Sequence, residues 1–175
     1  MKTKIWGIAI AALLLLPLFA QASTKRQPAS LEQQVRHELL MLPRFNVFDN
    51  LAFRIEGARV VLLGEVTWPN LKNEAGRVVR AIPGVEAVDN RIEVLPLSPL
   101  DNRIRYAELR AIYRQPGFQK YGMGTQPSIR IIVRNGNVTL EGVVDRQTDK
   151  SVAELEAKTV SGVFSVTNNL RVVKP

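Results

Sequence analysis

Cysteine is absent from this 175-residue sequence, and histidine occurs once, at His37. Without cysteine the chain can form no disulfide bond and cannot be lipidated on a cysteine, so its fold must depend on the hydrophobic core alone. Metal sites usually need several His, Cys or clustered carboxylate ligands, and a Ser-His-Asp triad would need His37. His37 falls at helical spacing opposite Leu31, Val35 and Leu39, where a solvated residue is the simpler interpretation. We therefore expect no cofactor, no metal ion, no evident small-molecule substrate and no enzymatic activity.

A long apolar run stands at the start of the sequence. Two lysines precede residues 5–20, which are almost wholly apolar, and the small-x-small sequence 20–22 follows. This order is typical of a secretory signal peptide, with cleavage expected after Ala22. The run is shorter than the roughly 20 apolar residues that span a bilayer comfortably, and an uncleaved N-terminal anchor is the alternative. We predict a signal peptide over 1–22 and a flexible N-terminal segment over 23–29.

Acidic residues are the minority, since 24 Lys and Arg stand against 16 Asp and Glu. Removing the two lysines of the predicted signal peptide leaves 24 − 2 = 22 basic side chains and a net charge of 22 − 16 = +6. A positive surface favours anionic partners such as lipid head groups, polyanionic envelope polymers or nucleic acid. Export makes nucleic acid the least expected of these, and we predict that none is bound.

The rest of the chain repeats itself at an offset of 78 residues. The match runs without gaps over the 35 positions from 60 to 94 and contains eleven identities, whereas ordinary composition would give about two by chance. The identical pairs are Val60/Val138, Leu62/Leu140, Gly64/Gly142, Val66/Val144, Lys72/Lys150, Ala75/Ala153, Gly84/Gly162, Val85/Val163, Val88/Val166, Asn90/Asn168 and Val94/Val172. The sequence therefore predicts an internal duplication.

Each copy has the pattern helix, strand, strand, helix, strand. In copy one the predicted elements are a helix from 31 that Pro43 ends, strands 51–56 and 60–66, a helix over 69–82 and a strand over 85–94. In copy two they are a helix from 99 to about 115, strands 129–134 and 138–144, a helix over 148–160 and a strand over 163–173. We predict an α+β fold of two tandem αββαβ modules, each a small three-stranded mixed sheet packed by two helices. The modules span 30–95 and 100–173, joined by a short, proline-stiffened linker over 96–99.

Four of the repeated residues are glycines with structural interpretations. Gly84 and Gly162 follow helices, where a left-handed residue is favoured. Gly64 and Gly142 lie inside strands, where a missing side chain indicates a bulge or a close approach by a neighbouring segment. We expect these glycines to serve the scaffold rather than a binding site.

The strand and helix-to-strand segments carry a family resemblance. In copy two these are "VTLEGVVD" (138–145) and "VSGVFSVTNNLRV" (160–172), and in copy one "RVVLLGEV" (59–66) and "IPGVEAVDNRIEV" (82–94). The chain resembles the BON domain, named for bacterial osmotically inducible and nodulation proteins, over roughly 30–95 and 99–173. The resemblance implies a periplasmic or outer-membrane-associated protein, a phospholipid-binding domain and a part in osmotic or envelope stress. Copy one departs from the family pattern at Glu65 and Trp68, which favours copy two as the binding copy.

The first helix of copy two carries a row of cations. Arg103, Arg110 and Arg114 stand at spacings of seven and four, with Ala107 and Ala111 beside them. Such a row could lie against anionic head groups, and the alternative is an ordinary solvated helix face. The residues expected on the opposite side, facing the sheet, are Tyr106, Leu109, Ile112 and Tyr113.

The loop after this helix, 118–127, has about five residues more than its counterpart in copy one. It carries Phe118, Lys120, Tyr121 and Met123, and aromatic and basic residues together suit an interfacial contact. The alternative is that Phe118 and Tyr121 pack beneath the loop, as Phe45 would in copy one.

These features predict a non-enzymatic, periplasmic binding module that associates peripherally with anionic phospholipid membranes and supports envelope integrity. The proposed contact residues are Arg103, Arg110, Arg114, Phe118, Lys120 and Tyr121. The alternative function is that of a protein-interaction adaptor, which would bind an envelope protein through a sheet edge or through the groove between the modules.

Overall fold

The computed structural model describes residues 30–123 and 126–173. The predicted signal peptide, its cleavage site after Ala22 and the predicted flexible segment over 23–29 lie outside the described residues. Within those residues, no helix is both long enough and apolar enough to cross a membrane.

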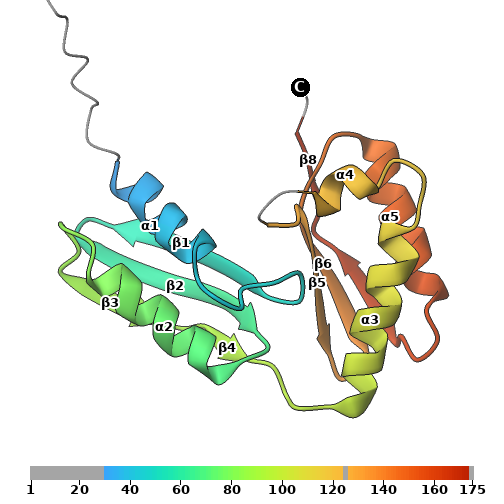
Figure 1. Ribbon diagram of the computed structural model, residues 1–175, viewed down its shortest axis with the longest axis horizontal. Helices are drawn as coiled ribbons and strands as arrows, with labels where there is room; N and C mark the ends of the chain where they lie inside the picture. The colour runs from blue at the N-terminus through green and yellow to red at the C-terminus, as the bar shows by residue number, and fades with distance from the viewer. Residues whose placement is uncertain (1–29, 124–125, 174–175) are drawn as a thin grey trace, which may run out of the picture.

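The first module contains two helices on a mixed sheet. Its elements are α1 (Leu31–Leu40), β1 (Asn50–Glu56), β2 (Arg59–Val66), α2 (Pro69–Arg80), β3 (Ala87–Asn90) and β4 (Glu93–Val94). Strand β1 pairs antiparallel with β2, and β2 pairs parallel with both β3 and β4. Helices α1 and α2 lie side by side against the sheet (Figure 1), and their apolar residues share one core with β2.

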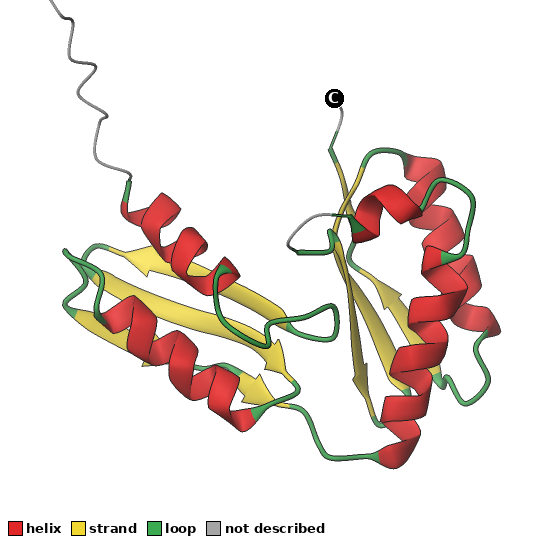
Figure 2. Cartoon of the chain, viewed as in Figure 1, coloured by secondary structure: helices red, strands yellow, loops and turns green. Residues whose placement is uncertain are grey.

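The second module repeats this plan. Its elements are α3 (Pro99–Tyr113), α4 (Gln119–Gly122), β5 (Ile129–Arg134), β6 (Asn137–Val144), α5 (Gln147–Thr159), β7 (Ser165–Asn168) and β8 (Arg171–Val172). Strand β6 pairs antiparallel with β5 and parallel with β7 and β8. The predicted fold class, two tandem α+β modules with mixed sheets, is confirmed (Figure 2). The last strand of each module, predicted as continuous, is interrupted after its fourth residue.

A repeated asparagine causes the interruption. The Asn90 side chain donates from Nδ2 to the carbonyl of Lys72 in α2 at 2.7 Å, and its Oδ1 accepts the N–H two residues ahead at 3.2 Å. Asn168 donates to the carbonyl of Lys150 in α5 at 2.9 Å and accepts the corresponding N–H at 3.2 Å. The asparagine side chain thus replaces a hydrogen bond between strands, and it connects the last strand to the second helix in both modules.

Two of the repeated glycines lie where the backbone strands approach closely. Gly64 has φ +108° and Gly142 has φ +120°, a region that favours glycine. A Cβ atom at Gly64 would lie 2.0 Å from the carbonyl oxygen of Asn50, and one at Gly142 would lie 1.9 Å from that of Ser128. Each glycine therefore lets the first strand of its module begin close to the second.

The face that α3 turns to the sheet differs from the prediction. Its buried residues are Asp101, Ile104, Arg105, Glu108 and Ile112. Of the four residues predicted to face the sheet, Ile112 is buried, Leu109 and Tyr113 are half-buried, and Tyr106 is 54% exposed. The apolar pattern was misleading because three charged residues, Asp101, Arg105 and Glu108, lie on the buried face of the helix. This face has helical spacing, but it is not made up of apolar residues alone.

The two modules are in contact through the segment between α1 and β1. The Val47 carbonyl accepts a hydrogen bond from the Ile131 N–H on the outer edge of β5 at 2.8 Å. The Val47 side chain is part of the core of the second module. Arg130 donates to the Asn46 carbonyl at 3.0 Å and lies over the Phe45 ring, 4.5 Å from its centroid. Figure 1 shows this loop reaching from the first module to β5.

Candidate functional site

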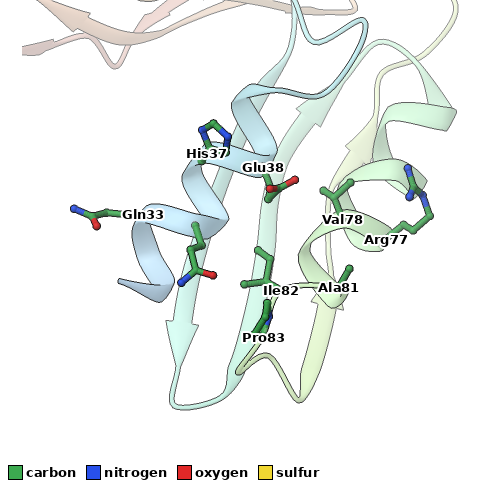
Figure 3. Close-up of a pocket in the computed structure, with 9 residues that line it drawn as sticks. Gln33, His37, Glu38, Arg77, Val78, Ala81, Ile82 and Pro83 are labelled. Carbon is green, nitrogen blue, oxygen red and sulfur yellow. The ribbon is translucent and has the colours of Figure 1, made fainter. Parts of the chain in front are cut away.

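Each module has a groove along its first helix, beside the end of its second helix. The first groove, of about 430 Å³, is lined by Gln33, Gln34, His37 and Glu38 of α1, Arg77 and Val78 of α2, and Ala81, Ile82 and Pro83 (Figure 3). The second groove, of about 690 Å³, is lined by Leu100, Asn102, Arg103, Ile104, Tyr106, Ala107 and Arg110 of α3, and by Ser161 and Gly162 after α5.

The two grooves are equivalent positions of the duplicated fold. Aligning Pro43 with Pro116, an offset of 116 − 43 = 73, places His37 on Arg110. The same offset places Gln33 on Tyr106. On the other wall, the offset of 78 places Pro83 on Ser161. The duplication therefore kept the groove and changed its chemistry, since the Gln33 amide is replaced by the Tyr106 phenol and the His37 imidazole by the Arg110 guanidinium.

The second groove carries an uncompensated positive charge. Arg103 and Arg110 are exposed, and neither guanidinium forms an ion pair with any residue that the structure describes. Leu100 is 46% and Tyr106 54% exposed on the same helix. A cationic groove with apolar side chains at its rim has the composition of surfaces that lie in the membrane interface.

The first groove has a different balance of charge. Glu38 projects from α1 and Arg77 from α2, so that acidic and basic side chains come from opposite walls of the groove, which His37 also lines (Figure 3). In the part of the chain that the structure describes, no three His, Asp or Glu side chains gather in a way that could hold a metal ion. This groove therefore lacks the cationic excess of its counterpart.

The remaining predicted contact residues do not join the second groove. Arg114 is exposed at the C-terminal cap of α3 but is not part of the groove lining. Phe118 and Tyr121 are only 3% and 4% exposed and pack edge to face in the core of the module, with ring centroids 5.5 Å apart. Their burial decides between the two alternatives for this loop, because the rings pack beneath it and present no interfacial surface.

Lys120 and Tyr121 fasten the loop to the start of α5. The Lys120 ammonium lies 2.6 Å from Asp145 and 3.6 Å from Asp149, and the charge-assisted hydrogen bond to Asp145 raises the pKa of Lys120. The Tyr121 hydroxyl accepts the Asp145 N–H at 3.0 Å and donates to the Asp149 carboxylate. Lys120 is therefore a compensated cation, unlike Arg103.

Sequence reasoning did not identify three exposed apolar residues near the second groove. Besides Leu100 and Tyr106, Phe164 is 86% exposed two residues after Gly162, and its N–H donates to the carbonyl of Gly136 in the β5–β6 turn at 2.8 Å. The exposure of Phe164 could have been predicted from the repeat, because the offset of 78 aligns Phe164 with Glu86, a polar residue of copy one.

The structural glycines lie at the expected places in the fold. Gly84 and Gly162, which follow α2 and α5, have φ values of +92° and +90°. They shape the turn that closes the end of each groove, and Gly162 lies beside Leu100 and Ile104 of α3.

Comparison with known proteins gives a family and a weak structural similarity. The family model of the BON domain matches residues 28–96 and 119–174. Curated protein sequences give no match. Two solved structures of CdsD, a structural protein of the type III secretion system of Chlamydia trachomatis, are similar to this chain at 13% sequence identity. Each alignment covers 84% of this chain. The first covers 99% of the CdsD chain at a TM-score of 0.33, and the second covers 94% at a TM-score of 0.34.

Proposed function

The chain belongs to the BON domain family, and from this premise we propose that it is a non-enzymatic periplasmic protein whose second module binds the surface of anionic phospholipid membranes and thereby supports envelope integrity. The observation that carries the proposal is the pair of uncompensated guanidinium groups, Arg103 and Arg110, in the second groove. The periplasmic location rests on the predicted signal peptide.

The physical basis is the addition of two modest attractions. A basic side chain close to an anionic lipid surface contributes on the order of 1 kcal/mol. Apolar side chains that enter the interface add a hydrophobic contribution in proportion to the area they bury, and Leu100, Tyr106 and Phe164 offer such area beside the arginines. The first groove, with Glu38 and Arg77 on opposite walls, offers no comparable combination.

Co-sedimentation with vesicles tests the proposal. We expect the protein to bind vesicles that contain phosphatidylglycerol and not vesicles of phosphatidylcholine alone, and to lose binding as salt is raised, because exposed charges are screened. The double variant R103Q/R110Q should bind about 30-fold more weakly, since two charges together contribute about 2 kcal/mol. R77Q/R80Q, which removes two exposed arginines of α2, is the matched control and should bind normally. Equal binding to both vesicle types, or equal loss in both double variants, would overturn the proposal.

A second function, that of a protein-interaction adaptor, is favoured by one observation. The outer edge of β5 receives the Val47 carbonyl at the Ile131 N–H, and the offset of 78 places Phe53 of β1 on Ile131. No strand of the described chain pairs with the outer edge of β1, so this edge could accept an extended segment of an envelope protein. Retention of such a partner at high salt, with no vesicle binding, would favour this function over the first.

A further inference from the structure

A cleft of about 390 Å³ lies between the two modules. Four segments form it: the α1–β1 loop, the junction of β2 and α2, the linker and α3. The lining residues are Asn46, Val47, Phe48, Thr67, Trp68, Leu95, Pro96, Leu97, Asn102, Arg105 and Tyr106. Its volume falls in the range of about 300–1,000 Å³ that is usual for small-molecule sites.

Large apolar side chains remain open to solvent in this cleft. Leu97 is 93% exposed, Tyr106 54% and Trp68 51%, and Phe48 packs edge to face on Tyr106 with centroids 5.2 Å apart. Contiguous exposed apolar groups of this kind mark binding surfaces in monomeric proteins. The cleft therefore suits the hydrocarbon part of a ligand.

A buried cation with an unused donor lies in the wall of the cleft. Arg105 is 3% exposed. Its Nη1 donates to Asn102 Oδ1 and its Nη2 to the Val133 carbonyl, both at 2.7 Å, whereas its Nε has no hydrogen-bond partner among the described residues. No described carboxylate forms an ion pair with Arg105. A buried charge without a direct ion pair is costly, and an anion in contact with it would offset part of that cost.

The two nearest acids are engaged elsewhere. The Asp49 carboxylate accepts the N–H groups of Asn46 and Thr67 at 3.1 and 2.6 Å, and the Asp101 carboxylate accepts two N–H groups of the β5–β6 turn at 2.9 and 2.8 Å. Burial lowers the pKa of Arg105, while the charges of Asp101 and Asp49 act in the opposite direction. Arg105 therefore keeps an incompletely satisfied guanidinium in the wall of a cleft that is lined mainly by apolar side chains.

We propose that this inter-module cleft binds a single-chain amphiphile with a carboxylate head, of the class of fatty-acid anions. The carboxylate is bound beside Arg105 and Asn102, and the alkyl chain lies along Trp68 and Leu97. One alkyl chain matches the volume of the cleft, and a two-chain phospholipid exceeds it. The site is separate from the proposed membrane-binding function and does not depend on it.

Tryptophan fluorescence provides a direct test. The sequence has two tryptophans, Trp6 and Trp68. Trp6 lies in the predicted signal peptide, so the mature protein, residues 23–175, has Trp68 in the wall of the cleft as its single reporter. Titration with decanoate below its micelle concentration should give a saturable blue shift of the Trp68 emission. Butyrate, which lacks the chain, and 1-decanol, which lacks the charge, should bind at least tenfold more weakly. No saturable change with decanoate, or equal binding of 1-decanol, would overturn the proposal.

Variants of the mature protein, with Trp68 as the reporter, locate the site. L97E places a negative charge on a 93% exposed side chain of the cleft and should abolish decanoate binding without unfolding the protein. L155E, on a 62% exposed side chain of α5, is the matched control and should bind normally. R105M should lose the preference for decanoate over 1-decanol if it folds, and L97E decides the matter if it does not. Normal binding by L97E would contradict the proposed site.

The same variants separate this proposal from the membrane-binding function. L97E should sediment normally with anionic vesicles, and R103Q/R110Q should bind decanoate normally. Tyr106 and Asn102 line both the cleft and the second groove, so neither serves to distinguish the two sites.

Discussion

At the scale of single residues, the second module contains an acid in a position built for an apolar side chain. Glu108 is fully buried, and neither of its carboxyl oxygens has a hydrogen-bond partner among the described residues. The offset of 73 places it on Val35 of α1, which is also fully buried. Loss of solvation raises the pKa of Glu108 to about 8, so the group is protonated at neutral pH and packs as a nearly apolar side chain.

This acid predicts a stability that falls with rising pH. A carboxyl group whose pKa is raised in the folded state contributes stability that is fully present below the unfolded pKa, near 4.5, and is lost as pH rises through about 8. Each unit of difference corresponds to about 1.4 kcal/mol. We expect the free energy of unfolding, measured with urea, to fall by several kcal/mol between pH 5 and pH 9. E108V, which introduces the residue of copy one, should remove most of this slope.

The control for Glu108 is an acid that is exposed to solvent. E86Q alters such a residue in the loop before β3, and its pH profile should follow that of the unaltered protein. An unchanged slope in E108V would show that Glu108 is ionised or solvated in the folded protein.

The arginine groove shows how much of the site could be predicted from residue spacing. Arg103 and Arg110 are two helical turns apart, and helical periodicity alone places them on one stripe, as the structure does. The burial of Phe118 and Tyr121 could not be predicted in this way. The Tyr121 hydroxyl is held by hydrogen bonds to residues 24 and 28 positions further along the chain, which no local pattern records, and Phe118 packs on the Tyr121 ring.

At the scale of elements, the duplication made the fold predictable. Two copies with the same alternation and the same turn residues fix the order of helices and strands better than either copy alone. The prediction was wrong about the continuity of the last strand, because Asn90 and Asn168 were visible only as identities. Their role required the positions of the helix carbonyls that they bind, which the alternation of strand residues does not reveal.

The hydrogen bonds of Asn168 predict that replacing it lowers the free energy of unfolding more than replacing its neighbour Asn169 does. N168A removes the bonds to the Lys150 carbonyl, to the Glu154 carboxylate and to the N–H of Leu170, and it leaves this N–H without its partner. We expect a loss of about 1–3 kcal/mol in the free energy of unfolding. N169A removes a bond to Glu141 on the exposed surface and should cost less than about 1 kcal/mol. Urea unfolding of both variants measures the difference. Equal losses in the free energy of unfolding would mean that the hydrogen bonds of Asn168 stabilise the fold no more than the surface bond of Asn169.

At the scale of the whole molecule, the contact between modules is the part least accessible from sequence. The short linker indicated that the modules lie close together, but it did not identify their contact. Val47 lies in a loop that has no helical or strand periodicity. Its side chain packs in the core of the second module, where, except for Phe48, every other residue comes from position 104 or later. Arg130 and Gln126 add hydrogen bonds to the carbonyls of Asn46 and Leu40. The first module thus supplies part of the core of the second.

This contact predicts that the two modules unfold together. Val47 is 9% exposed, and burial of a valine side chain contributes about 1.5–3 kcal/mol, while an unpaired charge in its place is more costly still. V47D should therefore destabilise the second module by about 3 kcal/mol or more and separate one cooperative urea transition into two. Small-angle X-ray scattering should show a larger radius of gyration before the first of these transitions. A52D, which places the same charge on an exposed residue of β1, should keep one transition and an unchanged radius. A single transition and an unchanged radius in V47D would mean that the linker alone, with its two prolines, holds the modules in their arrangement.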